Sequence, residues 1–167
     1  RNLAAGRGGK LAYIDDAGRY TYDDLARRAD RCANALVGLG IQREQRVLLA
    51  LLDTIDFPAA FLGAIKAGIV PVAANTLLTT ADYAYMLSDS RAVALVVSEA
   101  LLPAFVPLLG TLGDLRHVIV SGLDAHGHLL FSELLSGSAD RFEAAPTCAD
   151  DTCFWLYSSG STGAPKG

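Results

Sequence analysis

Two continuous apolar runs, at residues 47–52 and 92–97, constrain the fold of this chain most. Each run has the length of a strand and contains no polar residue, which is typical of a strand that is covered on both faces. Stretches with helical spacing of apolar residues lie before and between the runs, at 22–38, 56–67 and 81–88. Because strands and helices alternate at short intervals, the sequence predicts βαβ units with a mainly parallel sheet, and therefore an α/β fold.

Further predicted elements extend this alternation. Residues 11–14 and 19–22 flank a turn in which Gly18 is available for a left-handed position, so they predict a hairpin. Pro71, in a strand at 69–73, indicates an edge strand or an irregular ladder, because proline cannot donate a ladder hydrogen bond. The remaining predictions are a helix at 101–109 that prolines interrupt, a strand at 118–120, a short helix at 129–135 and a strand at 153–157.

The predicted helix at 22–38 has a clear start signal. Thr21 fits the N-cap position, and Asp24 lies in the first turn, where the helix dipole favours negative charge. Three arginines lie largely on the face opposite to the apolar residues, and we interpret that face as a solvated surface and not as a binding patch. These residues are Arg27, Arg28 and Arg31.

The composition excludes several classes of protein. The chain has 167 residues, of which 51% are hydrophobic, so it is globular and not disordered. Its net charge of −4, its pI of about 5.2 and the lack of a basic stripe argue against nucleic acid as the main partner. Since no apolar run reaches the roughly 18 residues of a membrane span, the sequence predicts no membrane segment.

The cysteines and histidines predict no metal site. Cys32, Cys148 and Cys153 are scattered and form no C-x-x-C pair. We expect them to stay reduced in the cytoplasm, with Cys32 and Cys153 as small core residues. His126 and His128 flank one glycine, and for this pair a solvated loop is favoured over a metal site.

The stretch at 157–167 combines the residues that a polyphosphate needs. Its glycines allow close backbone approach, its hydroxyls donate hydrogen bonds, and its lysine adds a cation. A flexible Gly/Ser linker is the alternative. The apolar run at 153–157 favours a phosphate-binding loop, because it leads into the stretch as a buried strand leads into a functional turn. The polar and glycine residues are Ser158, Ser159, Gly160, Ser161, Thr162, Gly163, Lys166 and Gly167.

This loop differs from the common nucleotide-binding motifs. The pattern G-x-x-x-x-G-K-[ST] fails, because Pro165 stands at the second glycine position and Gly167 follows the lysine. The pattern G-x-G-x-x-G is also absent. Residues 158–167 instead resemble the phosphate-binding signature of the acyl-adenylate-forming (AMP-binding) superfamily, [ST]-[ST]-G-[ST]-T-G-x-P-K-G, which they match at every position.

Other segments extend the resemblance along the chain. Residues 20–25 resemble the superfamily element T-Y-x-[ED]-L, and residues 63–72 resemble its G-x-x-[KY]-A-G segment. Residues 154–157, 72–79 and 81–87 resemble the benzoate-CoA ligase and hydroxybenzoate-CoA ligase branch. The resemblance implies an ATP-dependent acid-thiol ligase that is active on an aromatic carboxylic acid.

The resemblance also implies the chemistry of the loop. The carboxylate attacks the α-phosphate of ATP, which Mg²⁺ accompanies, and coenzyme A then displaces AMP to give the thioester. Lys166 would stabilise the charge of the departing pyrophosphate. The implied ATP phosphate-binding residues are Ser158, Ser159, Gly160, Ser161, Thr162, Gly163 and Lys166.

We expect residues 1–167 to be the N-terminal portion of a larger adenylation domain that ends here in the loop at 157–167. In the superfamily, the aryl pocket, the adenine site and the main catalytic lysine follow the loop, so we expect the isolated chain to be inactive as a ligase. Two alternatives stay open: an adenylating enzyme that loads a carrier protein, and a non-catalytic nucleotide-binding domain. The sequence also leaves open an oligomer and the identity of the aryl acid.

Overall fold

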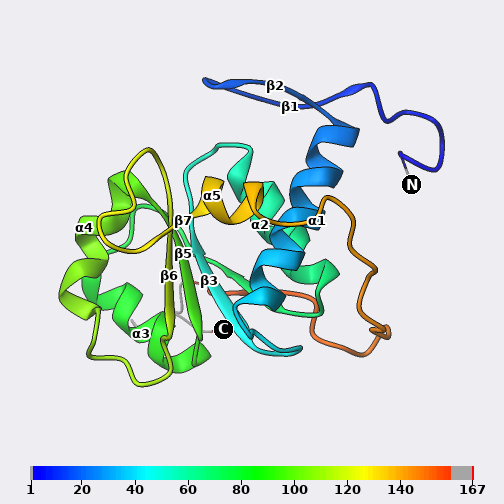
Figure 1. Ribbon diagram of the computed structural model, residues 1–167. Coiled ribbons are helices and arrows are strands. Elements are labelled where there is room, and N and C mark those ends of the chain that lie inside the picture. The colour runs from blue at the N-terminus through cyan, green and yellow to red at the C-terminus, as the bar shows by residue number, and fades with distance from the viewer. Residues whose placement is uncertain (1, 159–166) are drawn as a thin grey trace.

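The chain forms a six-stranded parallel sheet and a separate two-stranded hairpin (Figure 1). The computed structural model describes residues 2–158 and 167. In the large sheet the strands follow the order β7-β6-β5-β3-β4-β8, and each neighbouring pair is parallel. The strands are β1 (Leu11–Asp15), β2 (Gly18–Thr21), β3 (Arg46–Ala50), β4 (Val70–Ala73), β5 (Ala94–Ser98), β6 (His117–Ser121), β7 (Leu129–Leu130) and β8 (Trp155–Leu156). The α/β class with a mainly parallel sheet is therefore confirmed.

Helices cover both faces of the sheet (Figure 1). The α-helices are α1 (Tyr22–Gly38), α2 (Asp56–Lys66), α3 (Thr80–Ser90), α4 (Leu102–Phe105) and α5 (Phe131–Ser136). Short 3₁₀ turns, η1 (Glu99–Leu101) and η2 (Val106–Leu108), flank α4, as the two prolines of this segment predicted. Thr21 caps α1 in a capping box with Asp24, and Thr79 caps α3 with Asp82 in the same way.

The central strands divide their side chains between two cores. Successive residues of a strand point to opposite faces, so Val47 and Leu49 of β3 face one core, while Leu48 and Ala50 face the other. The first core contains residues of α1, α2 and α5, and the second contains residues of α3 and α4. Because both faces of β3 and β5 are covered, their sequences are apolar except for Arg46 at the start of β3 and Ser98 at the end of β5.

The two helices α1 and α2 approach each other closely at Gly63. A Cβ atom at this position would lie 2.7 Å from the carbonyl oxygen of Ala29 and 2.7 Å from the Cβ of Cys32. Cys32 is buried there, and desolvation raises the pKa of its thiol to about 12. The prediction that Cys32 is a small core residue is confirmed.

The sequence predicted that Pro71 places β4 at an edge of the sheet or in an irregular ladder, but β4 is not an edge strand. The strand lies between β3 and β8. The backbone N–H groups of Val70 and Ala74 donate to β3 and its preceding residue, so the N–H that Pro71 lacks would point toward β8. Pairing with β8 begins only at Val72, and the missing donor therefore leaves the sheet intact.

Four further sequence predictions differ from the structure. Residues 129–130 form the strand β7 before α5, whereas a helix was predicted across them. The strand at 153–157 shortens to the two residues of β8, which leaves Cys153 exposed and outside the core. Gly18 was available for a left-handed position in the β1–β2 turn, but it does not adopt a positive φ. Instead, the carboxylate of Asp15 accepts from the N–H groups of Ala17 and Gly18, both at 2.9 Å.

No helix among the described residues has the length and apolar character needed to cross a membrane.

Candidate functional site

The predicted phosphate loop begins where β8 ends, at the carboxyl edge of the parallel sheet. The loops after β3, β4, β5 and β6 open at the same edge, because all these strands run in one direction. Ser158 is exposed immediately after Tyr157. The other predicted phosphate-binding residues lie outside the described residues: Ser159, Gly160, Ser161, Thr162, Gly163 and Lys166.

An aromatic group holds the start of the loop against α3. The Tyr157 hydroxyl donates to the Asp89 carboxylate over 2.6 Å. The ring of Tyr157 stacks on Trp155, with 5.8 Å between centroids, and meets the edge of Tyr85 at 6.3 Å. Desolvation raises the pKa of the Tyr157 phenol, and the Asp89 charge raises it further. Tyr157 therefore donates this hydrogen bond as a neutral phenol at physiological pH.

The far end of the predicted loop returns to the same aromatic pair. A Cβ atom at Gly167 would overlap the indole nitrogen of Trp155 and press on the ring of Tyr157. The position accepts only glycine in this arrangement. Tyr157 and Gly167, the first and last residues of the predicted loop, thus meet at one place beside β8.

The neighbouring loop after β4 has its own fixed geometry. The backbone N–H of Leu77 donates to the side-chain oxygen of Asn75 over 2.9 Å, and the Tyr83 hydroxyl donates to the Asn75 carbonyl over 2.9 Å. Tyr83 is buried, and its ring stacks on Phe105 with 4.3 Å between centroids. Leu77 is 89% exposed. This loop therefore presents one apolar side chain next to the edge from which the phosphate loop starts.

A cavity of about 950 Å³ opens beyond β3, β5 and β6 at the same edge. Here the strand order reverses, since β4 and β5 lie on opposite sides of β3, and such switch points are usual ligand sites in open α/β sheets. Its lining is acidic, with five carboxylates against one arginine and one histidine. The carboxylates are those of Asp15, Asp16, Asp53, Asp56 and Glu99. This charge does not suit a phosphate or an aryl carboxylate.

Backbone donors hold two of these carboxylates in their charged form. The N–H groups of Leu123 and Asp124 donate to Glu99 and lower its pKa. Desolvation opposes ionisation of Asp15, but the N–H groups of Ile55 and of the β1–β2 turn outweigh it and lower the pKa of Asp15. His126 contacts Glu99 at 3.2 Å. Across the described residues, no group of three or more histidine, cysteine, aspartate or glutamate side chains is placed to hold a metal ion.

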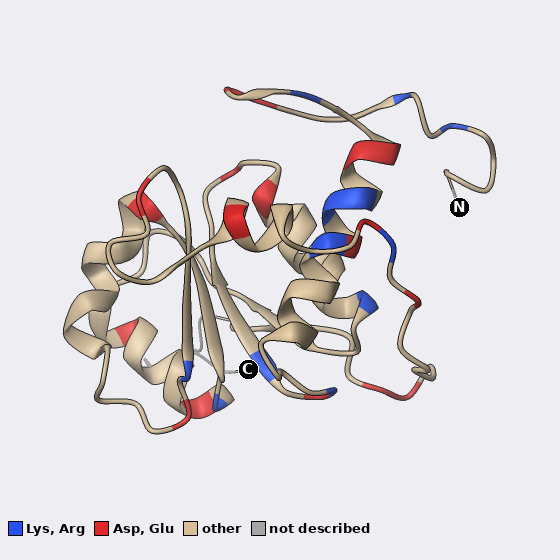
Figure 2. Cartoon of the chain, viewed as in Figure 1, with Lys and Arg blue, Asp and Glu red and all other residues tan. Residues whose placement is uncertain are grey.

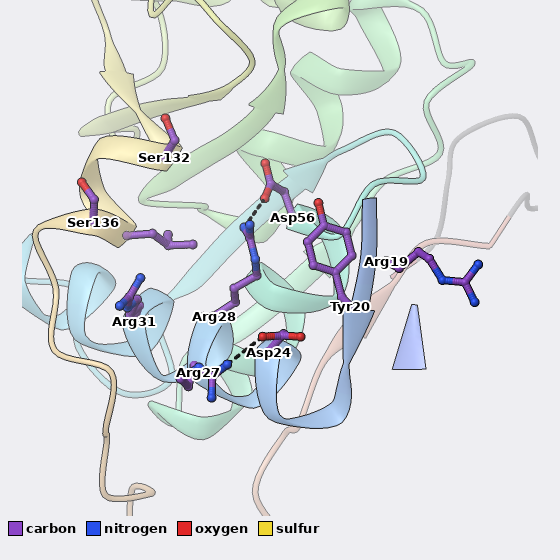
Figure 3. Close-up of a pocket in the computed structure, with 10 residues that line it drawn as sticks. Arg19, Tyr20, Asp24, Arg27, Arg28, Arg31, Asp56, Ser132 and Ser136 are labelled. Atoms are coloured by element: carbon purple, nitrogen blue, oxygen red, sulfur yellow. Dashed lines mark hydrogen bonds and ion pairs between the residues drawn. The ribbon is translucent and has the colours of Figure 1, made fainter. Parts of the chain in front are cut away.

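A smaller pocket of about 460 Å³ lies between β2, α1 and α5 (Figure 3). Its lining includes the three arginines that the sequence placed on a solvated face. The Arg28 guanidinium lies 5.1 Å above the ring of Tyr20 and 3.5 Å from the Asp56 carboxylate. The arginine-lined pocket adjoins the acidic cavity, since Tyr20, Arg28, Asp56 and Ser132 line both spaces.

Sequence comparison decides the family. The chain matches the AMP-binding enzyme family over residues 1–167. It belongs to the AMP-binding enzyme family. It is 60% identical over its whole length to a benzoate-CoA ligase of Thauera aromatica, of which it covers 32%. The chain thus spans about a third of the length of this curated relative.

Solved structures of the AMP-binding enzyme family share the fold. A benzoate-CoA ligase from Burkholderia xenovorans superposes with a TM-score of 0.88 at 48% identity, over 99% of this chain and 32% of that one. An anthranilate-CoA ligase in complex with anthranoyl-AMP superposes with a TM-score of 0.95 at 35% identity, over 100% of this chain and 32% of that one. The resemblance to the benzoate-CoA ligase branch is therefore confirmed, whereas the roles of the individual loop residues stay predictions.

Proposed function

We propose that the whole protein is an ATP-dependent aryl-CoA ligase that acts on benzoate or a substituted benzoate. The observation that carries this proposal is the identity of 60% to a benzoate-CoA ligase across all of residues 1–167. The complete match of residues 158–167 to the superfamily signature supports it. On this proposal, residues 1–167 are the N-terminal portion of the large adenylation domain.

The proposed reaction has two steps, with MgATP and coenzyme A as co-substrates. The aryl carboxylate first attacks the α-phosphate of ATP and releases pyrophosphate. The thiol of coenzyme A then displaces AMP from the aryl-adenylate and forms the thioester. Residues of this chain would act in the first step, by binding the β- and γ-phosphates and holding the α-phosphate in line with the carboxylate.

Electrostatic stabilisation is the role that we propose for the loop. Negative charge accumulates on pyrophosphate as the bond to the α-phosphate breaks, and Lys166 would stabilise that charge. The hydroxyls and N–H groups would supply hydrogen bonds, from Ser158, Ser159, Gly160, Ser161, Thr162 and Gly163. The aromatic group beside β8 supports this proposal, because it holds Tyr157, the first residue of the loop, and lies next to Gly167, the last.

Pyrophosphate release by the full-length protein tests the proposal. The assay contains ATP, Mg²⁺ and a panel of benzoates, with and without coenzyme A. We expect release that depends on an aryl acid, and a loss of about 100-fold or more in kcat for Lys166→Ala, since one preorganised charge contact is worth that much. Thioester formation with free coenzyme A distinguishes this function from loading of a carrier protein.

Lys10→Ala is the matched control, because Lys10 is an exposed lysine in the segment before β1. It should leave both kcat and KM unchanged. Release with no added acid, or equal loss in both lysine variants, would contradict the proposed function. A cytoplasmic location, predicted from the scattered cysteines, belongs to the same proposal.

A further inference from the structure

The pocket between β2, α1 and α5 has an excess of positive charge. Four arginines and two aspartates line it. Figure 2 shows basic residues along α1, and Figure 3 shows Arg27, Arg28 and Arg31 on this helix, with Arg31 nearest to α5. The charged residues are Arg19, Arg27, Arg28, Arg31, Asp24 and Asp56. The formal charge of the lining is therefore positive, although the chain as a whole carries −4.

Both aspartates of the pocket already have partners. Asp24 accepts from the Thr21 hydroxyl at 2.7 Å and from Arg27 at 2.6 Å. Asp56 accepts from the Ser121 hydroxyl at 2.7 Å and lies 3.5 Å from Arg28. The two aspartates of the pocket therefore pair with Arg27 and Arg28. Among residues 2–158 and 167, no carboxylate forms an ion pair with Arg19 or Arg31.

Arg31 is the unusual member of this group. Its Nε atom is buried and has no hydrogen-bond partner within the part of the chain that the structure describes. Across residues 2–158 and 167, its guanidinium forms no ion pair either. A buried donor without an acceptor is destabilising, and an anion in the pocket would offset that cost.

Hydroxyl groups stand beside Arg31 in the same pocket. Ser132 and Ser136 lie four residues apart on α5 and therefore on one face of this helix. In Figure 3, Arg31 extends toward α5, where Ser136 lies, while Arg19 points away from the other arginines. The planar fork of arginine matches the oxygens of a phosphate in a bidentate manner, and the Ser132 hydroxyl would add a donor, whereas the Ser136 hydroxyl already donates to the Glu133 carbonyl over 2.9 Å.

We propose that the pocket around Arg31, Ser132 and Ser136 binds the phosphate group of a small ligand. The site is separate from the predicted phosphate loop, because it is built on α1 and α5, whereas the loop follows β8 beyond β3 and β4. The adjoining acidic cavity, which shares Ser132 with this pocket, would repel the same ligand, so we place the phosphate at the Arg31 end of the pocket. The site does not depend on the proposed ligase function.

Titration with inorganic phosphate in a calorimeter tests this site. The protein is the full-length chain that carries Lys166→Ala, so that the predicted loop contributes least. We expect saturable binding of one phosphate, weakened about tenfold or more by Arg31→Gln. Arg7→Gln is the matched control, since Arg7 is exposed and lies in the segment before β1. It should change the dissociation constant less than about twofold.

A second variant keeps the test informative if Arg31→Gln fails to fold. Ser136→Glu places a carboxylate at an exposed position beside Arg31 and removes no packing. We expect it to abolish phosphate binding. The proposal is overturned if no saturable binding occurs up to about 10 mM phosphate. It is equally overturned if Ser136→Glu leaves binding intact, or if Arg7→Gln weakens binding as much as Arg31→Gln does.

Competition experiments then identify the source of the phosphate. Displacement by coenzyme A but not by dephospho-coenzyme A assigns the 3′-phosphate of coenzyme A, and only this arm depends on the proposed function. Failure of both to compete assigns free phosphate, and the site stands in either case. If phosphate binds as expected while the full-length protein releases no pyrophosphate with any acid, only the ligase function fails.

Discussion

The central strands and the edge strand of this sheet differ in how firmly they are held. All five residues of β5 are buried, and β5 pairs with β3 on one side and β6 on the other. Strand β8, at the edge opposite to β7, has two residues, pairs with β4 alone among the described strands, and leaves Leu156 56% exposed. Yet β8 is the strand that leads into the predicted phosphate loop. The most stable part of the molecule is therefore not the part that positions the loop.

The central strands and β8 are therefore held in place by different kinds of contact. Burial of apolar surface on both faces stabilises β3 and β5, at roughly 25 cal/mol per Å². The position of β8 depends on a few specific contacts, namely the stacking of Trp155 on Tyr157 and the hydrogen bond of Tyr157 to Asp89. Segments with few buried contacts open more readily than the core. We therefore expect core substitutions to change stability, and substitutions near β8 to change ligand affinity.

The largest expected effect is on the central strands. Leu48→Ala should lower the free energy of unfolding by about 2–5 kcal/mol, because Leu48 is fully buried and its removal leaves a cavity. Leu156→Ala is the matched control on β8 and should cost well under 1 kcal/mol. Urea unfolding of each variant provides the measurement. Equal shifts of the two midpoints would show that β8 is as firmly packed as β3.

A smaller effect is expected where α1 and α2 meet. Gly63→Val should destabilise the protein by about 1–3 kcal/mol, because its Cβ would lie 2.7 Å from the Ala29 carbonyl and force the helices apart. Gly38→Ala serves as the control, since a Cβ at Gly38 meets no atom within 4 Å. The thermal midpoint of each variant tests this, and a normal midpoint for Gly63→Val would refute the close approach.

The features that could be predicted from the sequence are those that local patterns determine. The apolar runs of β3 and β5 and the capping residue Thr21 predicted their elements correctly, because burial on both faces and a local hydrogen bond leave direct marks in sequence. Pro71 was misleading, because the effect of its missing N–H depends on where β8 begins to pair. That pairing joins residues far apart in the chain.

The phosphate loop could also be predicted from a local pattern, whereas the arginine-lined pocket could not. The motif at 158–167 identified the family, since phosphate recognition by backbone and hydroxyl groups uses consecutive residues. The arginine-lined pocket could not be predicted, because Ser132 and Ser136 come from α5, about a hundred residues after Arg31. The close spacing of Arg27, Arg28 and Arg31 was the only local signal, and a solvated helix face has the same spacing.

Removal of the Tyr157 hydroxyl tests whether a contact near β8 affects ligand affinity. Tyr157→Phe deletes the hydrogen bond to Asp89 and should cost about 1 kcal/mol of stability. If the proposed function holds, KM for ATP should rise by about two- to fivefold with little change in KM for the acid, because the start of the loop loses its anchor. Steady-state kinetics of the full-length protein measure both constants. Tyr85→Phe retains the ring contact and is the control, and an equal change in both substrates' KM would contradict a specific role of Tyr157.

The smallest effect comes from two matching helix caps. Thr21 and Thr79 each accept from the N–H of an aspartate three residues later, and their hydroxyl and N–H groups lower the pKa of Asp24 and Asp82. A lowered folded-state pKa means that this stabilisation is complete above the unfolded value of about 3.9 and is lost as the pH falls below it. Thr21→Ala and Thr79→Ala should each reduce the loss of stability between pH 5 and pH 3, which urea unfolding at the two pH values measures.

The same two variants also test whether the position of α3 affects the phosphate loop, because each variant removes the same kind of cap from a different helix. Helix α1 contributes to the first core, whereas α3 carries the Tyr85 and Asp89 that contact Tyr157. Thr79→Ala should therefore raise KM for ATP slightly at pH 7, and Thr21→Ala should not. If both caps affect ATP equally, the loop responds to overall stability and not to the position of α3. If only Thr79→Ala has the effect, the path from α3 through Tyr157 to the loop determines ATP affinity.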